Sequence, residues 1–277
     1  MYPRLSIIVP CFNQGHYLKD ALGNLSSAPN PFYEVIIVND GSTDPETIKV
    51  LQNLANQGFT VLNQENKGLA GARNTGIDSA LGEYIVPLDS DNKLRLEVVR
   101  ECMEMMDADA SIDVMYGNGM FFGESSGIWK NEEFNLQKLM IQNYIDACAI
   151  IRKSTIYKVG LYDRNMIAQG WEDWDLWLRL AFGGFKFKYI DSVFFDYRIV
   201  SNSMSKTLYA TYEKPNKLEN YIHQKYPDKM GHQWIWDHVI KRFKKNPFLF
   251  IVKLILRTYF PGKYRDLLNK HKIRNGI

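Results

Sequence analysis

The stretch that decides the fold is "EYIVPLDSD" (83–91), an apolar run that ends in two acidic residues one position apart. Three earlier runs have the same form, rich in β-branched or aromatic residues, and helix-like stretches of ten or more residues separate the four runs. This alternation is typical of βαβ units and predicts a parallel sheet with helices on its faces. The three earlier runs are "LSIIVP" (5–10), "YEVIIVND" (33–40) and "TVLNQ" (60–64).

Helices are expected between these strands. The clearest start is at Asp44-Pro45, because a capping aspartate precedes a proline at the first helical position. Beyond residue 91 the regular alternation fades into a mixture of helices and strands, and from about Ser205 the pattern is mainly helical. The predicted helices cover about 15–28, 45–56, 69–80, 94–107 and 171–182, and the predicted later strands about 113–122 and 186–199.

Charge is distributed unevenly along the 277 residues. Residues 237–277 hold eleven Lys or Arg against two Asp, a charge of +9, so the +3 of the whole chain leaves −6 for residues 1–236. Such a basic tail favours an anionic partner, either a membrane surface or a nucleic acid. No nucleic-acid-binding motif accompanies the charge, so the membrane is the better prediction. The longest uninterrupted apolar run of the tail, "PFLFIV" (247–252), is too short to span a bilayer.

The three cysteines predict neither a disulfide framework nor a zinc site, because they are odd in number, widely spaced and not in CxxC pairs. A reducing, cytoplasmic compartment fits this usage best. A strand-like run already begins at Leu5, and we therefore expect no signal peptide before it.

Polar residues follow each predicted strand, and in open α/β sheets ligands bind beyond the carboxyl ends of the strands. After the fourth strand, Asp89 and Asp91 could hold Mg²⁺ or Mn²⁺ together with a substrate diphosphate, with a solvated turn as the alternative. After the second strand, Asp40 opens the turn "DGSTD" (40–44). This turn could hydrogen-bond a base or a ribose, and the alternative is a plain strand-to-helix loop. The chain has neither a GxGxxG after the first strand nor a Walker motif, which disfavours NAD enzymes and P-loop ATPases.

The segment "NKGLAGARNTGI" (66–77) holds a candidate binding residue. Gly68 and Gly71 permit close backbone approach, and Arg73 can donate to a base carbonyl or a phosphate. The alternative is a surface helix with an exposed arginine.

The segment "GWEDWDLWLRLAFGG" (170–184) predicts a helix with acidic residues in its first turn. Asp173 heads the face continued by apolar residues, so we expect it to point toward the protein, where it could act as a base. Simple stabilisation of the helix dipole is the alternative. Trp171 could stack against a sugar ring or belong to the core.

Taken in order, these segments resemble glycosyltransferase family 2, the inverting enzymes of the GT-A fold. Each piece is weak alone, but the ordered set is highly specific, and it favours the metal site over the turn at Asp89–Asp91. The matching pieces are "SIIVPCFNQGHYL" (6–18), "VIIVNDGSTD" (35–44), "NKGLAGARNTGI" (66–77), "YIVPLDSDN" (84–92), "GLYD" (160–163), "GWEDWDLWLRL" (170–180) and "YRIVSNSMS" (197–205).

The resemblance implies a role for each matched residue. Asp91 would bind a divalent metal, Mn²⁺ or Mg²⁺, that bridges the diphosphate of the donor. Asp173 would be the catalytic base, and Trp171 and Glu172 fall where the acceptor sugar is gripped. The residues implied to bind the nucleotide, most often a uridine nucleotide in this family, are Pro10, Phe12, Asn13, Asp40, Arg73, Asp89 at the ribose, and Ser90.

The implied fold is α/β, a GT-A domain with a Rossmann-like, mostly parallel central sheet flanked by helices and followed by a C-terminal helical extension. We expect residues 1–95 to form the nucleotide-sugar-binding half, 96–205 the acceptor-binding and catalytic half, and 206–277 the basic extension. The implied reaction is a metal-assisted single displacement that moves a hexosyl or N-acetylhexosaminyl unit from a nucleotide-sugar, most often a UDP-sugar. The acceptor would be a glycan or a lipid-linked glycan of surface polysaccharide biosynthesis.

One departure from the family concerns the stretch "YRIVSNSMS" (197–205). Many relatives have a histidine there, near the active site, whereas this chain has Val200, which cannot ligate a metal. The departure leaves open a catalytically silent nucleotide- or sugar-binding module. A sugar-phosphate nucleotidyltransferase is disfavoured, because "VPCFNQG" (9–15) is not the glycine-rich signature that it requires.

The tail carries two open interpretations. Aromatic and aliphatic residues alternate with Lys and Arg over 234–270, as in an amphipathic helix that lies in an anionic membrane interface on the inner face of the cell membrane. The same pattern suits a helical pair that packs on the body or on a second subunit.

Overall fold

The structure is a computed structural model of the chain. It describes residues 2–28, 30–166, 170–200, 213–230, 239–241, 243–260 and 262–264.

The first third of the chain is a run of βαβ units. Strands β1, β2, β3 and β4 lie parallel in the order β3-β2-β1-β4, as the alternation predicts. The predicted bounds of β2, α2 and β3 agree with the structure. The elements are β1 (Leu5–Cys11), α1 (Gly15–Ala21), β2 (Tyr33–Asp40), α2 (Pro45–Asn56), β3 (Thr60–Gln64), α3 (Gly68–Ser79) and β4 (Tyr84–Pro87).

Helix α1 is shorter than the predicted 15–28, because the chain turns away after Ala21. The backbone N–H of Leu25 bonds to the carbonyl of Leu22, and the Asn24 amide donates to the Leu94 carbonyl at 2.7 Å. Helix α2 starts where predicted, and Asp44 Oδ2 accepts the Thr47 backbone N–H at 2.8 Å. A turn thus follows the first helix, and an aspartate cap starts the next.

The middle of the chain extends the same sheet with mixed pairing. Strand β8 joins β4 antiparallel, β6 pairs antiparallel with β8 and parallel with β9, and β5 closes the far edge against β9. The prediction of a mostly parallel sheet is therefore correct for the first four strands, whereas the later strands add antiparallel pairs. The elements are β5 (Lys93–Leu94), α4 (Leu96–Ala108), β6 (Ile112–Gly123), β7 (Gly127–Trp129), α5 (Leu136–Leu139), β8 (Ile150–Arg152), α6 (Lys153–Val159), α7 (Glu172–Phe182) and β9 (Lys186–Ile199).

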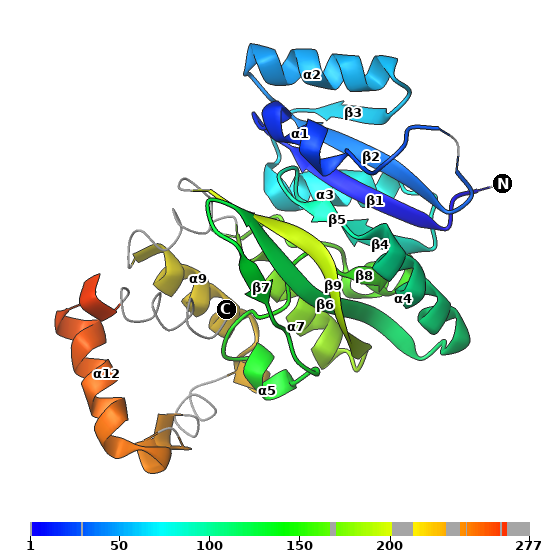
Figure 1. The fold of residues 1–277 in the computed structure, drawn as a ribbon. Coiled ribbons are helices and arrows are strands. Elements are labelled where there is room, and N and C mark those ends of the chain that lie inside the picture. Colours follow the sequence, from blue (N-terminus) through cyan, green and yellow to red (C-terminus); the bar gives the residue numbers. More distant parts are fainter. Residues whose placement is uncertain are drawn as a thin grey trace.

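Helices cover both faces of the sheet, and two apolar clusters fill the space between the layers (Figure 1). Ile7 and Val9 of β1 point to the cluster that α1, α2 and α4 cover, whereas Ile8 points to the cluster of α3 and α7. Gly76 of α3 allows this close packing, since a Cβ atom there would lie 2.3 Å from Ile8 Cγ2. All seven residues of β1 are buried, as expected of a central strand covered on both faces.

The described part of the C-terminal region is helical, as predicted, with α9 (Glu213–Lys225), α10 (Pro227–Met230) and α12 (Pro247–Tyr259). Helix α9 and the residue after it are held to the body, because Lys225 pairs with Asp163 and the Tyr226 hydroxyl donates to Asp175. Helix α12 stands apart from the sheet (orange in Figure 1). Within the part of the chain that the structure describes, no helix is both long and apolar enough to cross a membrane.

Candidate active site

Side-chain hydrogen bonds tie together the carboxyl ends of the first strands. Asn13, just past β1, accepts the backbone N–H groups of Thr43 and Asp44 at 2.8 and 2.9 Å. The Ser90 hydroxyl, just past β4, donates to Gln14 Oε1 at 2.6 Å. The polar residues after β1, β2 and β4 therefore meet at one edge, as the strand-end rule predicts.

Residues 10–13 and 40 form one side of this edge. Pro10 is buried within β1, whereas the Phe12 ring is 45% exposed. Asn13 has a φ of +55°, in the left-handed region that asparagine tolerates. Asp40 is buried, and its Oδ1 accepts the Gln64 amide at 2.6 Å and the Lys67 backbone N–H at 2.8 Å.

Arg73 joins three elements at the centre of the site. Its guanidinium is buried on α3 and donates to Asp89 Oδ1 after β4 and to Glu172 Oε1 on α7, both at 2.7 Å. Burial would lower the pKa of this guanidinium, but the carboxylates of Asp89 and Glu172 outweigh burial and raise it. Arg73 is not the exposed arginine of a surface helix, which was the alternative in the sequence.

Glu172, the residue expected to contact the acceptor, is almost fully buried. Its side chain is 4% exposed, and both oxygens accept hydrogen bonds, Oε1 from Arg73 and Oε2 from the Gly170 backbone at 2.7 Å. In this structure the Glu172 carboxylate is therefore occupied by Arg73 and by the Gly170 backbone. Trp171 is half-buried and meets Trp174 edge to face, with ring centroids 5.2 Å apart.

Asp173 points toward the protein, as the sequence predicts, and is half-buried. Its Oδ1 accepts the Trp174 backbone N–H at 2.8 Å, and its Oδ2 accepts the Asn143 amide at 2.8 Å. Burial raises the pKa of Asp173 well above the usual aspartate range, and the Glu172 carboxylate adds to the rise while Arg73 opposes it. A carboxylate with a raised pKa at the edge of a site is suited to general base chemistry.

Asp91 lies on the loop after β4, beside Asp89. Burial, and then the charge of Asp89, raises the pKa of Asp91 to about 6. Arg198 of β9 supports this loop, since its Nε donates to the Asp91 carbonyl at 3.1 Å and its backbone N–H to Asn92 Oδ1 at 3.0 Å. Val200 lies directly after β9, and residues 201–205 of the departing motif are outside the described residues.

Three residues at this site were not predicted from the sequence, namely Arg198, Asn143 and Asp146. Asp146 faces the cluster, and burial, followed by the charge of Asp89, raises its pKa above the usual range. The only signal was an acidic residue in the otherwise apolar run "YIDACAI" (144–150). Asn143 carried no signal, because an asparagine in a loop is ordinary.

Buried atoms without partners gather at the same place. Among the described residues, three buried side-chain nitrogen or oxygen atoms have no hydrogen-bond partner: Arg73 Nε, Asn143 Oδ1 and Tyr162 Oη. Tyr162 lies under the Arg73 guanidinium, 5.3 Å from it, and Asn143 holds Asp173. Unpaired buried polar atoms are rare in folded proteins, so their concentration here favours a ligand-binding site.

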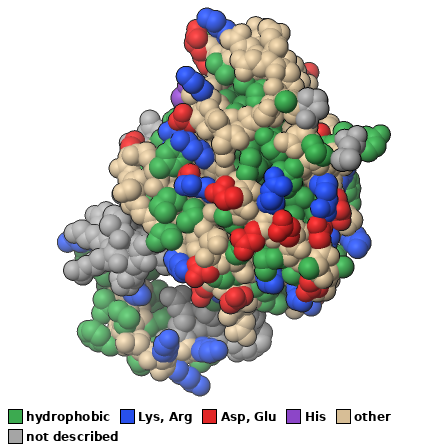
Figure 2. Space-filling view, turned by 45° about the vertical axis from the view of Figure 1, so that its right-hand side comes forward, with side chains coloured by type: hydrophobic (Ala, Val, Ile, Leu, Met, Phe, Trp, Pro, Cys, Tyr) green, Lys and Arg blue, Asp and Glu red, His purple; other side chains and the backbone are tan. Residues whose placement is uncertain are grey.

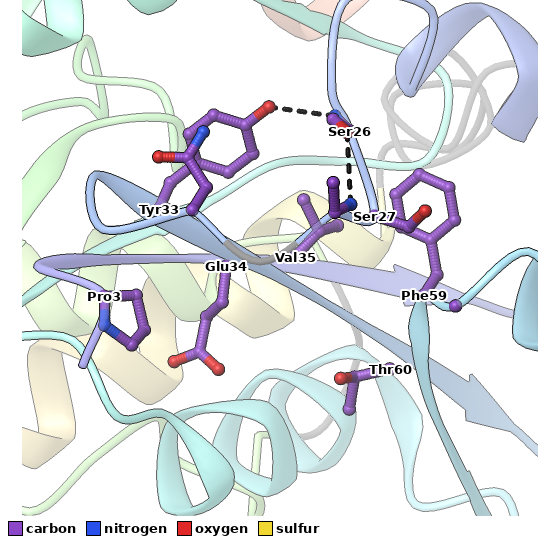
Figure 3. Close-up of a pocket in the computed structure, with 11 residues that line it drawn as sticks. Pro3, Ser26, Ser27, Tyr33, Glu34, Val35, Phe59 and Thr60 are labelled. Carbon is purple, nitrogen blue, oxygen red and sulfur yellow. Dashed lines mark hydrogen bonds between the residues drawn. The ribbon is translucent and has the colours of Figure 1, made fainter. Parts of the chain in front are cut away.

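A separate pocket lies at the opposite end of the strands. Figure 3 shows its lining residues, among them Pro3, Tyr33, Glu34 and Thr60 at the amino ends of β1, β2 and β3. The volume is about 160 Å³. Its lining contains none of the candidate residues of the sequence.

Known proteins resemble this chain both in sequence and in fold. The family model "Glycosyl transferase family 2" matches residues 6–166. An uncharacterized glycosyltransferase of Rickettsia typhi is 24% identical over 262 residues, which cover 90% of this chain and 75% of that protein.

Two solved structures have a similar fold. S. aureus TarS residues 1–349, in complex with UDP-GlcNAc, aligns with a TM-score of 0.59 and 18% identity over 81% of this chain and 73% of that one. The mannosyltransferase PcManGT from Pyrobaculum calidifontis, in complex with GDP-Man and Mn²⁺, aligns with a TM-score of 0.58 and 16% identity over 96% and 83%. At these identities the likeness concerns the fold.

Proposed function

The chain belongs to glycosyl transferase family 2 and is a glycosyltransferase with a GT-A fold, and from this premise we propose an inverting transfer from a UDP-sugar to a glycan or lipid-linked acceptor of surface polysaccharide biosynthesis. The observation that carries the proposal is the position of Arg73. By binding Asp89 and Glu172 together, Arg73 brings the loop of Asp91 and the start of α7 with Asp173 to one site.

The donor side of the site is formed by strand ends. Phe12 offers an exposed ring for stacking against a base, and Asp40 offers its Oδ2, since the described contacts use only Oδ1. Asn13 fixes the turn between β2 and α2, and Asp89 and Ser90 are proposed to contact the ribose and the phosphates. TarS was solved with UDP-GlcNAc and PcManGT with GDP-Man, so nucleotide-sugars are the donor class of similar folds. We assign uridine from the family resemblance.

A divalent metal, Mn²⁺ or Mg²⁺, fits the donor set of the site. Asp91 provides a hard carboxylate ligand. Among the described residues, the side-chain contact with Asp91 is that of Arg198, which reaches the backbone carbonyl and not the carboxylate. Among the described residues no three His, Cys, Asp or Glu side chains form a complete metal site. The protein would therefore share the ion with the donor diphosphate and water, the usual arrangement for Mg²⁺. When bound, the ion would neutralise charge that develops on the leaving diphosphate.

Asp173 is the proposed base. As the acceptor oxygen attacks the anomeric carbon, its proton passes to the Asp173 carboxylate, and the bond between that carbon and the diphosphate oxygen breaks with its electron pair on the nucleotide. Attack from the side opposite the nucleotide inverts the configuration. General base catalysis of this kind contributes about 10²–10⁴-fold to a rate, which sets the expected loss for a variant without the base.

The acceptor is proposed to lie at a membrane surface, reached through residues 234–270. Phe248, Ile251, Ile255 and Tyr259 recur at helical spacing on α12, and all four side chains are exposed. Lys244, Lys245 and Lys253 are exposed nearby. The lobe at the lower left of Figure 2, which carries α12, shows hydrophobic and basic side chains side by side. An exposed apolar helix face flanked by lysines is suited to the interface of an anionic bilayer.

Calorimetric titration tests the donor assignment. UDP, GDP, dTDP and CMP are added to the wild type and to Asp91→Asn, each with and without Mn²⁺. We expect UDP to bind best, Mn²⁺ to strengthen its binding, and Asp91→Asn to lose the strengthening. Tighter binding of another nucleotide would overturn the uridine assignment, and an unchanged Mn²⁺ effect in Asp91→Asn would overturn the metal assignment.

Asp173→Asn is the matched variant for the base. It should bind UDP as the wild type does but release UDP from a UDP-sugar about 10²–10⁴-fold more slowly. Unchanged release would remove Asp173 from the mechanism.

A further inference from the structure

The segment between α5 and β8 is attached to α7 by two indole groups. The Trp174 Nε1 donates to the Leu139 carbonyl at 2.6 Å, and the Trp177 Nε1 donates to the Ile145 carbonyl at 3.0 Å. Both indoles are buried, with 2% and 0% of their surface exposed. Buried hydrogen bonds of this kind hold a loop at a fixed distance from a helix. The residues between the two attachment points are thereby kept next to the first turn of α7.

Asn143 lies between these points and contacts Asp173 directly. Its Nδ2 donates to Asp173 Oδ2 at 2.8 Å, and the Trp174 backbone N–H donates to Asp173 Oδ1, also at 2.8 Å. Each carboxylate oxygen thus has one described N–H donor, which restricts rotation of the carboxylate. A donor to the ionised form also favours that form over the protonated one.

We propose that Asn143 is a positioning residue for Asp173, which orients the carboxylate and favours its ionised form before transfer. The inference rests on the proposed function, in which Asp173 is the base. After Asp173 has taken the proton of the acceptor, the Asn143 amide can turn by half a revolution. Its Oδ1, which has no partner in this structure, then accepts the new O–H of Asp173. The amide can therefore donate to the ionised carboxylate and accept from the protonated one. A side chain with donors alone could do only the first.

Other charged groups also act on Asp173, and the test must separate them from Asn143. Glu172 on the same helix and Asp146 on the loop raise its pKa, whereas Arg73 on α3 lowers it. None of these three groups is changed when Asn143 is replaced.

The test measures the titration of Asp173 itself, without donor, acceptor or metal. Protein labelled with ¹³C at the aspartate carboxyl carbons is titrated by NMR, and the Asp173 signal is identified by its absence in Asp173→Asn. In Asn143→Leu, which is close in size and has no donor, we expect the midpoint to rise by about one pH unit. In Asn143→Asp, which keeps the shape and adds a negative charge, we expect a larger rise.

Gln142→Leu is the matched control, because Gln142 is the exposed neighbour on the same loop. It should leave the Asp173 midpoint unchanged. UDP binding should persist in all variants, which shows that each is folded. An unchanged midpoint in both Asn143 variants would overturn the inference.

Kinetics of UDP release separate this result from failure of the proposed function. If Asp173→Asn still releases UDP at the rate of the wild type, the base assignment fails whatever Asn143 does. If Asp173→Asn loses activity while the pH profiles of both Asn143 variants match that of the wild type, only the positioning role fails. Support requires the acidic limb of the profile to move to higher pH in the Asn143 variants, a change that mere loss of stability would not produce.

Discussion

Arg73 is the residue on which the charge balance of the site depends. The carboxylates of Asp89 and Glu172 bind it directly, and Asp146 and Asp173 are close enough to interact with it electrostatically. One buried cation thus faces several carboxylates, and a cationic ligand would improve the balance. Removing one partner of a buried ion pair costs about 3–5 kcal/mol, because the remaining charge stays buried and unpaired. Arg73 is therefore needed for the structure of the site, apart from its proposed role in nucleotide binding.

The raised pKa of Asp173 predicts the pH dependence of the enzyme. As the proposed base, Asp173 must be ionised, and burial and Glu172 favour its protonated form. Activity should therefore fall as the pH drops through a pKa well above the ordinary aspartate value of about 4. The measurement is the rate of UDP release between pH 4.5 and 8.5, with Asp228→Asn, an exposed site on α10, as the control. A rate that stays constant down to pH 4.5 would contradict the prediction.

Helix α7 connects the site to the core. Its first turn carries Asp173, and its buried face carries Trp174 and Trp177, whose indole N–H groups hold the loop opposite. Asp175 lies buried on the same helix and binds Arg179 and Tyr226, which attaches the start of the tail. One helix thus positions the proposed base, the loop that contacts it and the C-terminal region. Trp174 and Trp177 belong to the core, whereas Trp171 is half-buried.

Trp177→Phe should destabilise this arrangement without changing the charge of the site. The replacement leaves the buried Ile145 carbonyl without its donor, and we expect a loss of about 1–3 kcal/mol in the free energy of unfolding. Urea unfolding measures the loss. Trp129→Phe is the control, because Trp129 is half-buried and no described hydrogen bond uses its indole. An equal effect of the two variants would show that the indole bond contributes nothing specific.

The whole molecule combines an acidic body with a basic, apolar tail. Of the fifteen exposed large hydrophobic side chains among the described residues, nine lie between Ile240 and Phe260. Exposed apolar residues are normal when they are single, whereas a cluster indicates a contact surface. Helix α12 is too short to cross a bilayer, and the lysines near it favour contact with an anionic membrane surface.

Vesicle co-sedimentation of the full chain tests the membrane surface. We expect binding to phosphatidylglycerol vesicles, much weaker binding to phosphatidylcholine, and loss of binding as salt rises, because the lysine contribution is screened. Phe248→Ser with Ile255→Ser should weaken binding at least about tenfold, since each buried side chain contributes about 1.5–3 kcal/mol. Leu81→Ser, at an exposed leucine of the body, is the control. A concentration-dependent dimer without vesicle binding would show that α12 covers a second copy instead.

Much of the element pattern could be predicted from the residues. The bounds of β2, β3 and β9 agree with the runs at 33–40, 60–64 and 186–199, because each run is rich in β-branched or aromatic residues. Strands β7 and β8 have three residues each and were not predicted, since so short a run has no measurable period. The convergence of the strand ends was also predicted, because parallel strands share one carboxyl edge.

The sequence by itself determined the βαβ order, the family and the set of polar residues at the strand ends, since these depend on local patterns and on spacing along the chain. Only the tertiary structure decided which of them meet. Arg73 is 99 residues from Glu172, and Asn143 is 30 residues from Asp173. Those contacts depend on how α7 packs on the sheet and on which carbonyls its tryptophans reach. Periodicity reports that a side chain is buried, but the partner of a buried polar group is chosen by the packing of distant elements.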